Sequence, residues 1–455
     1  MTGTVEEQID QWRGFVRRRR AISGPDVEEM EDHLREQIAD LEANGLDEEE
    51  AFLVAVKRMG NLDAVSREFA REHSERLWKQ LVLVPEAADG TGGFARWREL
   101  GVLLAFALGA GLAVKLASTL IDDEVGLVRN LAFVVLPFLA GWFAWKRGAP
   151  WRVRAAAVAL AVIPLLAVNL YPFHEADGPF AEPGMTDVLA FMHAPILLWL
   201  LVGALHTGGD WLSHDRRMDF VRFTGELVMY LVLIMLGSMV LIGLTAAVLA
   251  LAGVDLEPVL EDWLLPFGGP GALLVAAWLV EAKKSVVENI APVLTRVFTP
   301  LAFAMLLADL AVLVVNGPLT TVDRELLILM DAVLVLVLFL LLYSISARDP
   351  LAPPGIFDRL QLALVGAALA VDAIALTAML GRIAEFGSTA NKAAALGLNL
   401  VLLVHLAWSA WLLAGFVRGR RPFAEVERWQ TAYLPVYAAW SAVVVLVFPP
   451  VFGFI

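Results

Sequence analysis

Two patterns of hydrophobic and polar residues divide the chain near residue 82. Before this point, apolar residues recur at spacings of three and four, which predicts amphipathic helices. After about residue 99, apolar stretches of roughly 20 residues follow one another, the length that an α-helix needs to cross a bilayer. The patterns predict an all-α protein with a small helical bundle at 1–82, a linker at 83–98 and a polytopic transmembrane domain at 99–455.

The front bundle has clear helix boundaries. Pro25 and Gly45 are the expected start and stop of one helix. Its apolar stripe consists of Val27, Met30, Leu34, Ile38 and Leu41. Asp47, with Glu50 three residues later, has the pattern of a capping box. The helix that follows carries Ala51, Phe52, Ala55, Val56 and Met59 and ends at Gly60. With one helix over 5–20 and another after Asn61, we expect about four helices.

The later part contains eleven apolar segments of spanning length or nearly so. They cover about 100–121, 127–145, 153–173, 187–205, 227–252, 264–280, 297–316, 326–345, 359–380, 393–415 and 432–454. The sixth is the weakest, because "PFGGPG" at 266–271 interrupts it. This stretch is either a shallow loop before a short span or the break of a discontinuous helix, which transporters use to coordinate substrate.

The distribution of Lys and Arg supports eleven spans. Five alternate connections hold sixteen of these residues and the other five hold four. The rich connections are 146–154, 206–222, 281–296, 346–359 and 416–431. Cytoplasmic connections carry such an excess. We therefore expect a protein of the bacterial cytoplasmic (inner) membrane, with its N-terminus cytoplasmic and its C-terminus exterior.

Composition narrows the partners. The chain is 58% hydrophobic, only 18% charged and carries a net charge of −14, and it contains no cysteine. Residues 1–80 hold 12 Lys and Arg against 19 Asp and Glu, which argues against nucleic acid as a partner. No signal peptide is visible before residue 81. The one basic cluster, Arg17, Arg18, Arg19 and Arg20, indicates contact with anionic membrane lipid or with a protein partner.

The stretch "DHLREQIADLEANGLDEEEAFLVAVKRMGNLDAVSREF" resembles the permease prefix domain, also described as a helical signalling domain associated with PadR-type regulators. The shared features are a helix ending in Gly, then Leu-x-x-x-Glu-Ala, then an apolar helix that closes in Arg-x-Gly-Asn. The resemblance covers about residues 5–75. It implies a domain at the cytoplasmic front of a bacterial membrane protein, with a PadR-type regulator or a transport ATPase as a possible partner.

A second resemblance covers "RIAEFGSTANKAAAL" at 382–396. It is similar to an Arg-Ile-x-Glu-Tyr-Gly-x-Thr motif of a bacterial polytopic membrane family of unknown function. Phe386 replaces the Tyr here, Ser388 precedes Thr389, and Lys392 stands where an Arg is expected. This resemblance implies no activity.

Familiar catalytic motifs are missing: the sequence has no HExxH, GxSxG, Walker A or GxGxxG pattern. Enzymatic activity is therefore uncertain, and we expect neither a cofactor nor a metal site. "HTGGDWLSH" at 206–214 spaces His206, Asp210 and His214 as a metal site on a helix would. Gly208 and Gly209 argue against a continuous helix there, so a polar loop is favoured.

Five ionisable residues lie inside apolar segments and are the candidate binding residues. They are Lys115, His193, Asp309, Asp331 and Asp372. A charge at bilayer depth is costly unless it is paired or hydrated. Counted from the segment ends, all five lie roughly 9–12 Å below the outer edge. We therefore expect an outward-facing polar cavity in which Lys115 pairs with at least one aspartate, with His193 nearby. Separate helix–helix contacts are the alternative.

The predicted function is regulatory or signalling, with the front bundle docking a cytoplasmic protein. The alternative is a transporter, permease or permease subunit that uses the embedded charges, and a membrane enzyme comes third. The oligomeric state does not follow from the sequence.

Overall fold

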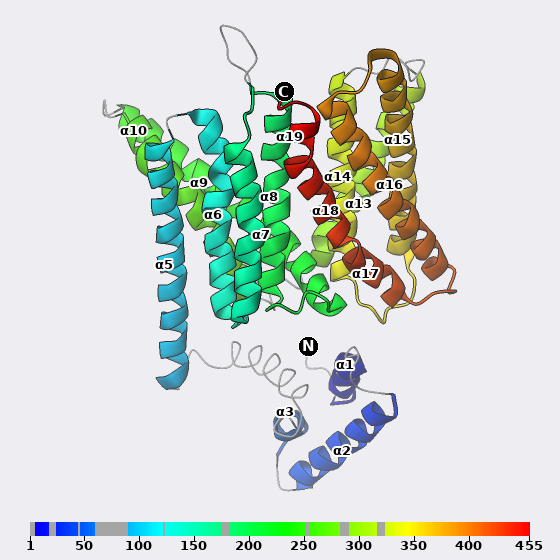
Figure 1. Ribbon diagram of the computed structural model, residues 1–455. Coiled ribbons are helices and arrows are strands. Elements are labelled where there is room, and N and C mark those ends of the chain that lie inside the picture. Colours follow the sequence, from blue (N-terminus) through cyan, green and yellow to red (C-terminus); the bar gives the residue numbers. More distant parts are fainter. Residues whose placement is uncertain are drawn as a thin grey trace. The chain divides into compact units, whose positions relative to one another are not determined.

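The computed structural model describes residues 5–17, 24–43, 46–59, 90–121, 123–174, 183–251, 255–282, 291–315 and 324–455 (Figure 1). Every regular element within these ranges is a helix. The chain divides into two compact units. The front unit is Met1–Ala95 with Asp349–Leu351, and the membrane unit is Arg96–Arg348 with Ala352–Ile455.

The front unit contains α1 (Val5–Arg17), α2 (Gly24–Ala43) and α3 (Glu48–Met59). The predicted apolar stripes are confirmed where the side chains are described. The buried core contains Ile9, Trp12, Leu34, Ile38, Leu41, Ala51, Phe52, Ala55 and Val56. Burying these side chains is the main stabilising term for a unit of this size.

The boundary between α2 and α3 follows the predicted capping pattern. The backbone N–H of Glu50 donates to Asp47 Oδ1 at 2.8 Å, which satisfies one of the free donors at the start of α3. Residues 60–89 lie outside the described residues, and with them the predicted fourth helix.

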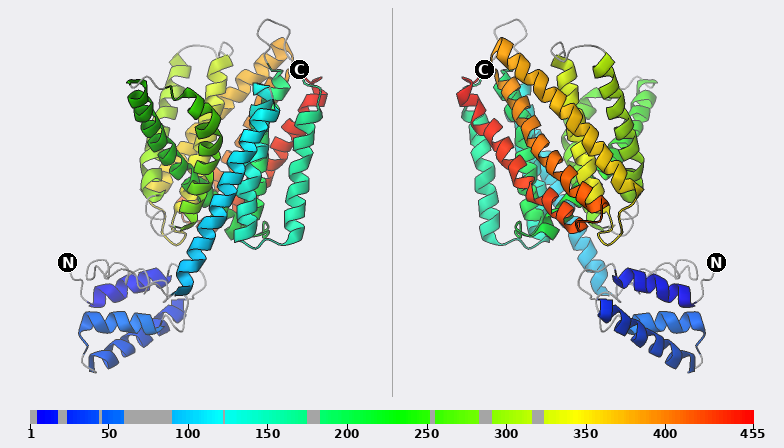
Figure 2. Two further views of the ribbon diagram at one scale, coloured as in Figure 1. Left: turned by 90° about the vertical axis from the view of Figure 1, so that its left-hand side faces the viewer. Right: turned by 90° about the vertical axis from the view of Figure 1, so that its right-hand side faces the viewer.

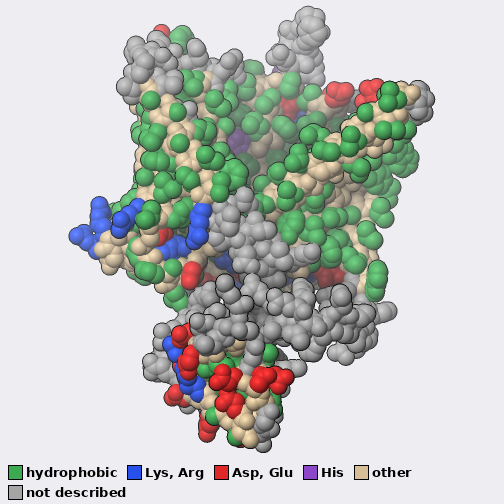
Figure 3. All heavy atoms as spheres, turned by 180° about the vertical axis from the view of Figure 1, so that it is seen from behind, with side chains coloured by type: hydrophobic (Ala, Val, Ile, Leu, Met, Phe, Trp, Pro, Cys, Tyr) green, Lys and Arg blue, Asp and Glu red, His purple; other side chains and the backbone are tan. Residues whose placement is uncertain are grey.

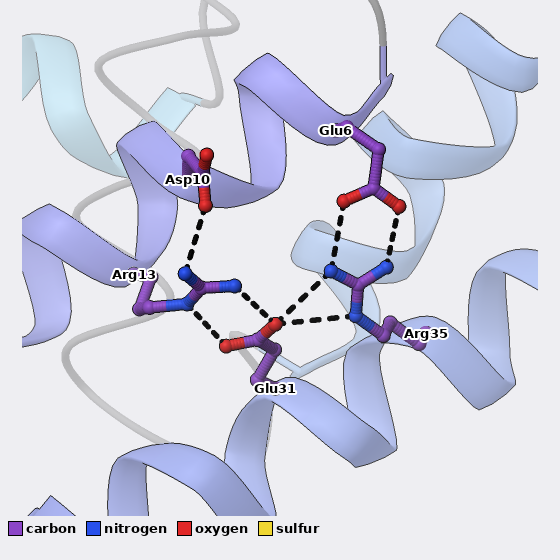
Figure 4. A network of polar contacts seen from close by, with 5 residues as sticks. All are labelled: Glu6, Asp10, Arg13, Glu31 and Arg35. Carbon is purple, nitrogen blue, oxygen red and sulfur yellow. Dashed lines mark hydrogen bonds and ion pairs between the residues drawn. The ribbon is translucent and has the colours of Figure 1, made fainter.

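An ion-pair network joins α1 to α2 (Figure 4). Glu31 accepts from Arg13 and from Arg35, and Arg35 also donates to Glu6 at 2.6 and 2.9 Å. Arg13 contacts Asp10 as well. The hydrogen bonds from Arg13 are the largest cause of a lowered pKa for the Glu31 carboxyl. This arrangement of charges fixes the register of the two helices more than it adds stability, because most of the side chains face solvent.

Nine helices in the described part of the membrane unit are long and apolar enough to span a bilayer. They are α5 (Gly90–Leu120), α6 (Glu124–Lys146), α7 (Trp151–Leu170), α8 (Met185–His206), α9 (His214–Leu251), α10 to α11 (257–282), α14 (Arg324–Ala347), α15 (Ile356–Phe386) and α16 (Ala390–Val417). Nine of the eleven predicted spans are therefore helices that are long and apolar enough to cross a bilayer. Two further expected spans lie outside these nine: α13 (Ala291–Val315), which has 25 residues and of which the described side chains form a shorter apolar stretch at Thr295–Ala308, and α18 (Leu434–Leu446), which has 13 residues.

The sixth apolar segment is a spanning candidate and differs from both expectations. α10 (Glu257–Val259) continues through a π-helical turn, η1 (Leu260–Leu264), into α11 (Leu265–Ala282). The "PFGGPG" stretch lies inside this continuous helix, with Pro270 within α11. A proline inside a helix removes one intrahelical hydrogen bond, and the π-helical turn lies directly before this stretch.

The membrane unit has two groups of packed helices. One core joins α5, α6, α8, α9 and α11, and a larger one joins α13, α14, α15 and α16. α18 lies between α8 and α16, after the short α17 (Phe423–Ala432), and α19 (Phe448–Val451) ends the described helices. Figure 2 shows α5 and α15 on opposite sides of this unit.

The flank of the membrane unit is apolar (Figure 3). α9 shows this most clearly, because no residue from Val228 to Leu251 is buried. Leu241 is 67% and Leu251 92% exposed. Such a surface suits lipid tails rather than water.

The two ends of the membrane unit differ in charge. The connections at 147–150, 207–213, 348–355 and 418–422 lie at one end, the lower one in Figure 1, and this basic end carries the Lys- and Arg-rich stretches. The other end, the acidic end, carries Asp123, Glu124, Asp255 and Glu257.

Candidate functional site

The five predicted residues lie on five helices. Lys115 is on α5, His193 on α8, Asp309 on α13, Asp331 on α14 and Asp372 on α15. The side chain of Asp309 lies outside the described residues, as do the side chains of Arg17, Arg18, Arg19 and Arg20.

Lys115 pairs with a residue that the sequence did not suggest. Its Nζ lies 2.5 Å from Asp262 Oδ1 in η1 and 5.8 Å from the ring centroid of Trp263. Lys115 therefore does not pair with Asp331 or Asp372, while a contact with Asp309, the third expected partner, lies outside the described side chains. The reason is the position of the helices around the bundle. α5 lies on the opposite side of the unit from α15, so side chains at the same depth do not meet (Figure 2).

His193 is also apart from any shared site. Its Nδ1 lies 2.8 Å from the carbonyl oxygen of Leu189, one turn earlier on α8. The imidazole is thus satisfied within its own helix. The expected cavity that unites all five side chains does not form among the described residues.

Asp331 and Asp372, in contrast, lie on helices that pack together. α14, α15 and α16 contact one another, and Asn399 of α16 contacts Asp331. Asn399 Nδ2 donates to Asp331 Oδ1 at 2.8 Å and to the carbonyl oxygen of Ala395 at 2.9 Å. The carboxyl groups of Asp331 and Asp372 interact electrostatically. We refer to Asp331, Asp372 and Asn399 as the acid cluster.

The acid cluster has more acceptors than donors. Asp372 and Asn399 are both 0% exposed. Neither carboxyl oxygen of Asp372, nor Asn399 Oδ1, has a hydrogen-bond partner among the described residues. Both hydrogens of the Asn399 amide are already directed at acceptors. Three buried oxygens therefore lack a donor, and no basic side chain is paired to them in the described chain.

The depth of this cluster differs from the expectation. α15 continues to Phe386, so Asp372 lies fourteen residues before the end of its helix. At 1.5 Å per residue, this is about 21 Å along the helix, against roughly 10 Å from the start of α14 to Asp331. Asp372 is therefore nearer the middle of its helix than the sequence count placed it.

A second buried polar group surrounds His405, which sequence reasoning missed. His405 is 0% exposed, its Nδ1 lies 2.5 Å from the Tyr437 hydroxyl, and its ring stacks on Tyr433 with centroids 4.7 Å apart. Trp429 Nε1 donates to the His405 carbonyl oxygen at 3.2 Å. A histidine inside "LVLLVHLAW" was the available signal.

Sequence reasoning also missed Glu281, near the basic end. Its side chain is 4% exposed and comes from the last turns of α11. Arg147 Nη2 donates to Glu281 Oε1 at 2.8 Å, Lys146 Nζ lies 3.6 Å from Oε2, and His206 Nε2 lies 3.6 Å from Oε1. Lys146 also donates to Glu99 of α5 at 2.7 Å. Glu281 thus joins α6, α8 and α11; we call this set the Glu281 hub.

A cavity of about 250 Å³ lies beside the Glu281 hub. Arg147, His206 and Glu281 line one part of it, and the first turns of α9 line the rest with Arg216, Asp219, Arg222 and Glu226. Arg222 donates to the Ser346 carbonyl oxygen at 2.6 and 3.0 Å, which holds its guanidinium against the end of α14.

His206, Asp210 and His214 do not lie on one helix. α8 ends at His206, Gly208 and Gly209 have φ values of 69° and 94°, and α9 begins at His214. His206 packs against Phe143, whereas His214 Nδ1 lies 2.9 Å from Thr431 Oγ1. The two histidines therefore face different surroundings, as a loop predicts.

The described helices are those of a multi-pass membrane protein. Comparison with known protein families, curated proteins and solved structures found no match. The two resemblances stated from the sequence therefore stay predictions.

Proposed function

We propose that this chain is a transporter-type membrane protein that binds a proton or a small cation at the acid cluster. The observation that carries the proposal is Asp372, which is fully buried and has no hydrogen-bond partner on either carboxyl oxygen among the described residues, while the carboxyl group of Asp331 acts on it electrostatically. A charged carboxylate in this position costs several kcal/mol unless a proton or a cation neutralises it.

The chemistry of the ligand follows from the acceptors. Two carboxyl groups that share one site hold one proton more readily than either would alone, because two like charges repel. The unpaired oxygens of Asp372 and Asn399 are also the ligand type that hard cations prefer. Membrane transporters place such residues on their ion pathways, which favours transport over a purely structural role.

The test uses the full chain reconstituted in vesicles. Infrared difference spectra between acidic and alkaline buffer should contain the band of a buried protonated carboxyl group, and Asp372→Asn should remove it. Titration with sodium chloride against choline chloride distinguishes a cation from a proton. Glu124→Gln, an exposed acid at the acidic end, is the matched control and should change neither result.

The transport arm measures ion entry. Vesicles with a pH dye inside and an imposed membrane potential should acidify through the wild type, and Asp372→Asn should reduce the rate to that of empty vesicles. If Asp372→Asn leaves the carboxyl band, the cation titration and the rate unchanged, the proposal fails.

A second candidate function is regulatory, and the front unit favours it. α1, α2 and α3 have an apolar core of their own and an acidic surface, and their sequence resembles the permease prefix domain. In this proposal the N-terminus lies in the bacterial cytoplasm, and the front unit docks a PadR-type regulator or a transport ATPase. The cluster Arg17–Arg20 contacts this partner or anionic lipid.

The test compares the tagged full chain with a variant in which Arg17 to Arg20 are serine. Purification from cross-linked cells should recover a regulator or ATPase with the wild type and not with the variant. Recovery of lipid alone, equally by both, would remove the regulatory candidate while leaving the acid cluster untouched.

A further inference from the structure

The cavity beside the Glu281 hub is a second site that the proposed function does not use. It lies near the basic end, whereas the acid cluster lies within α14, α15 and α16. At about 250 Å³ it is far larger than the 10–15 Å³ that one water needs, so it has room for a group of several non-hydrogen atoms.

The lining of the cavity carries both signs of charge in equal number. Arg147, Arg216 and Arg222 supply three cations. Asp219, Glu226 and Glu281 supply three carboxylates. An ion of either sign would therefore face three like charges, and at the edge of a low-dielectric region such repulsion is strong. A ligand that carries one charge of each sign matches this lining.

The basic side chains that line the cavity have hydrogen-bond donors without a partner among the described residues. Arg216 has no side-chain partner among the described residues. His206, which is 5% exposed, has no hydrogen bond to either ring nitrogen, and Arg147 Nε has none. Arginine forks and an imidazole close to one another bind phosphate oxygens well.

The acidic side chains line the same cavity, and Asp219 lies on α9 between Arg216 and Arg222. The side chain of Asp219 is 60% exposed, and its nearest cation is Arg222 Nη1 at 3.9 Å, beyond hydrogen-bond reach. Glu281 is already held by Lys146 and Arg147. Asp219 is therefore the carboxylate that can receive an ammonium group from a ligand.

The position of the cavity indicates where the ligand comes from. Its walls are Arg147 directly after α6, the last residues of α8 and α11 and the first turns of α9, so it lies at the level where spanning helices leave the apolar region. Lipid headgroups occupy this level of a bilayer.

We propose that this cavity binds an ammonium–phosphate zwitterion, the phosphoethanolamine headgroup of a membrane lipid. The phosphate lies at Arg147, Arg216 and His206, and the ammonium group lies at Asp219. Free phosphoethanolamine has the same chemistry, so the experiment must separate the two sources.

The test uses the full chain in detergent with defined lipids, followed by native mass spectrometry. Wild type should retain phosphatidylethanolamine several-fold more than phosphatidylglycerol, which lacks the ammonium group. Asp219→Asn should abolish this preference, and Arg216→Gln should reduce retention of both lipids. The matched controls, Asp210→Asn and Arg152→Gln, are exposed residues near the basic end outside the cavity lining and should behave as wild type.

Two further readings complete the test. Displacement of the bound lipid by excess free phosphoethanolamine would support recognition of the headgroup that both compounds share. Binding of free phosphoethanolamine without binding of either lipid would show that the ligand is the free compound rather than a membrane lipid. Equal retention of both lipids by wild type, or cavity variants indistinguishable from their controls, overturns the proposal. Arg216 and Asp219 are exposed, so their variants should fold, and equal melting temperatures verify this.

Discussion

The Glu281 hub and the acid cluster both contain a buried carboxyl group of the membrane unit, but the groups around the two carboxyl groups differ in charge. Glu281, 4% exposed, lies against two basic side chains and a histidine. Asp372, 0% exposed, has no hydrogen-bond partner on either carboxyl oxygen among the described residues and interacts electrostatically with Asp331. The first arrangement stabilises the fold through paired charges, and the second leaves a charge for something outside the chain to neutralise. The comparison teaches that burial of an acid does not mark a ligand site, whereas burial without a partner does.

The largest expected effect comes from breaking the hub. Glu281→Gln leaves Lys146 and Arg147 without their buried carboxylate, and loss of one partner of such a pair lowers the free energy of unfolding by about 3 kcal/mol. Unfolding of the purified chain in mixed micelles measures it. Glu99→Gln, which removes a 32% exposed partner of Lys146, should cost less than about 1 kcal/mol. Equal losses in the two variants would mean that burial does not strengthen the hub.

Asp372→Asn should have the opposite sign. No ion pair is lost, and the neutral amide removes the charge of a buried carboxyl group whose oxygens lack donors among the described residues. We expect the free energy of unfolding to rise by about 1 kcal/mol, with the largest gain in alkaline buffer, where the wild-type carboxyl group is driven toward its charged form. The same micelle assay at several pH values measures this. A large loss of stability would show that Asp372 is a structural partner, as Glu281 is.

The sequence predicted what depends on periodicity and missed what depends on lateral packing. The stripe of Leu34, Ile38 and Leu41 and the cap at Asp47 are local features, and the structure has them. The partner of Lys115 is 147 residues away along the chain, so no local pattern could identify it. Counting residues places a side chain along a helix but not around the bundle.

The candidate sites show the same limit. Asp331 and Asp372 were found because charges inside apolar segments are rare. Glu281 was not, because it borders the polar stretch at 281–296 and looked like a loop residue. Only the ends of α6, α8 and α11 together show that it is buried.

A small effect is expected for Lys115, which pairs with Asp262 near the surface. The two side chains are 29% and 60% exposed, so Lys115→Met should lower the free energy of unfolding by about 0.5 kcal/mol. A double-mutant cycle with Asp262→Asn isolates the pair. The variant should leave ion binding at the acid cluster unchanged. A loss of that binding would show that Lys115 takes part in the site.

The smallest effect concerns the carboxylate network of the front unit, where solvent screens most of the interaction. The pKa of Glu31 is lowered, first by hydrogen bonds from Arg13 and then by those from Arg35. A carboxyl group with a lowered folded-state pKa binds protons more weakly than in the unfolded chain, so its contribution is present above the unfolded pKa. It is lost as the pH falls through about 4.3, where a free glutamate titrates, and below.

Hydrogen exchange of the α1 and α2 amides, corrected for intrinsic rates, should therefore show protection that weakens below this pH. Glu31→Gln should flatten that dependence, while Glu42→Gln on the exposed face of α2 should keep it. If Glu31→Gln keeps the wild-type profile, the network in Figure 4 contributes nothing to the front unit's stability, and the apolar core around Trp12 and Phe52 holds the helices by itself.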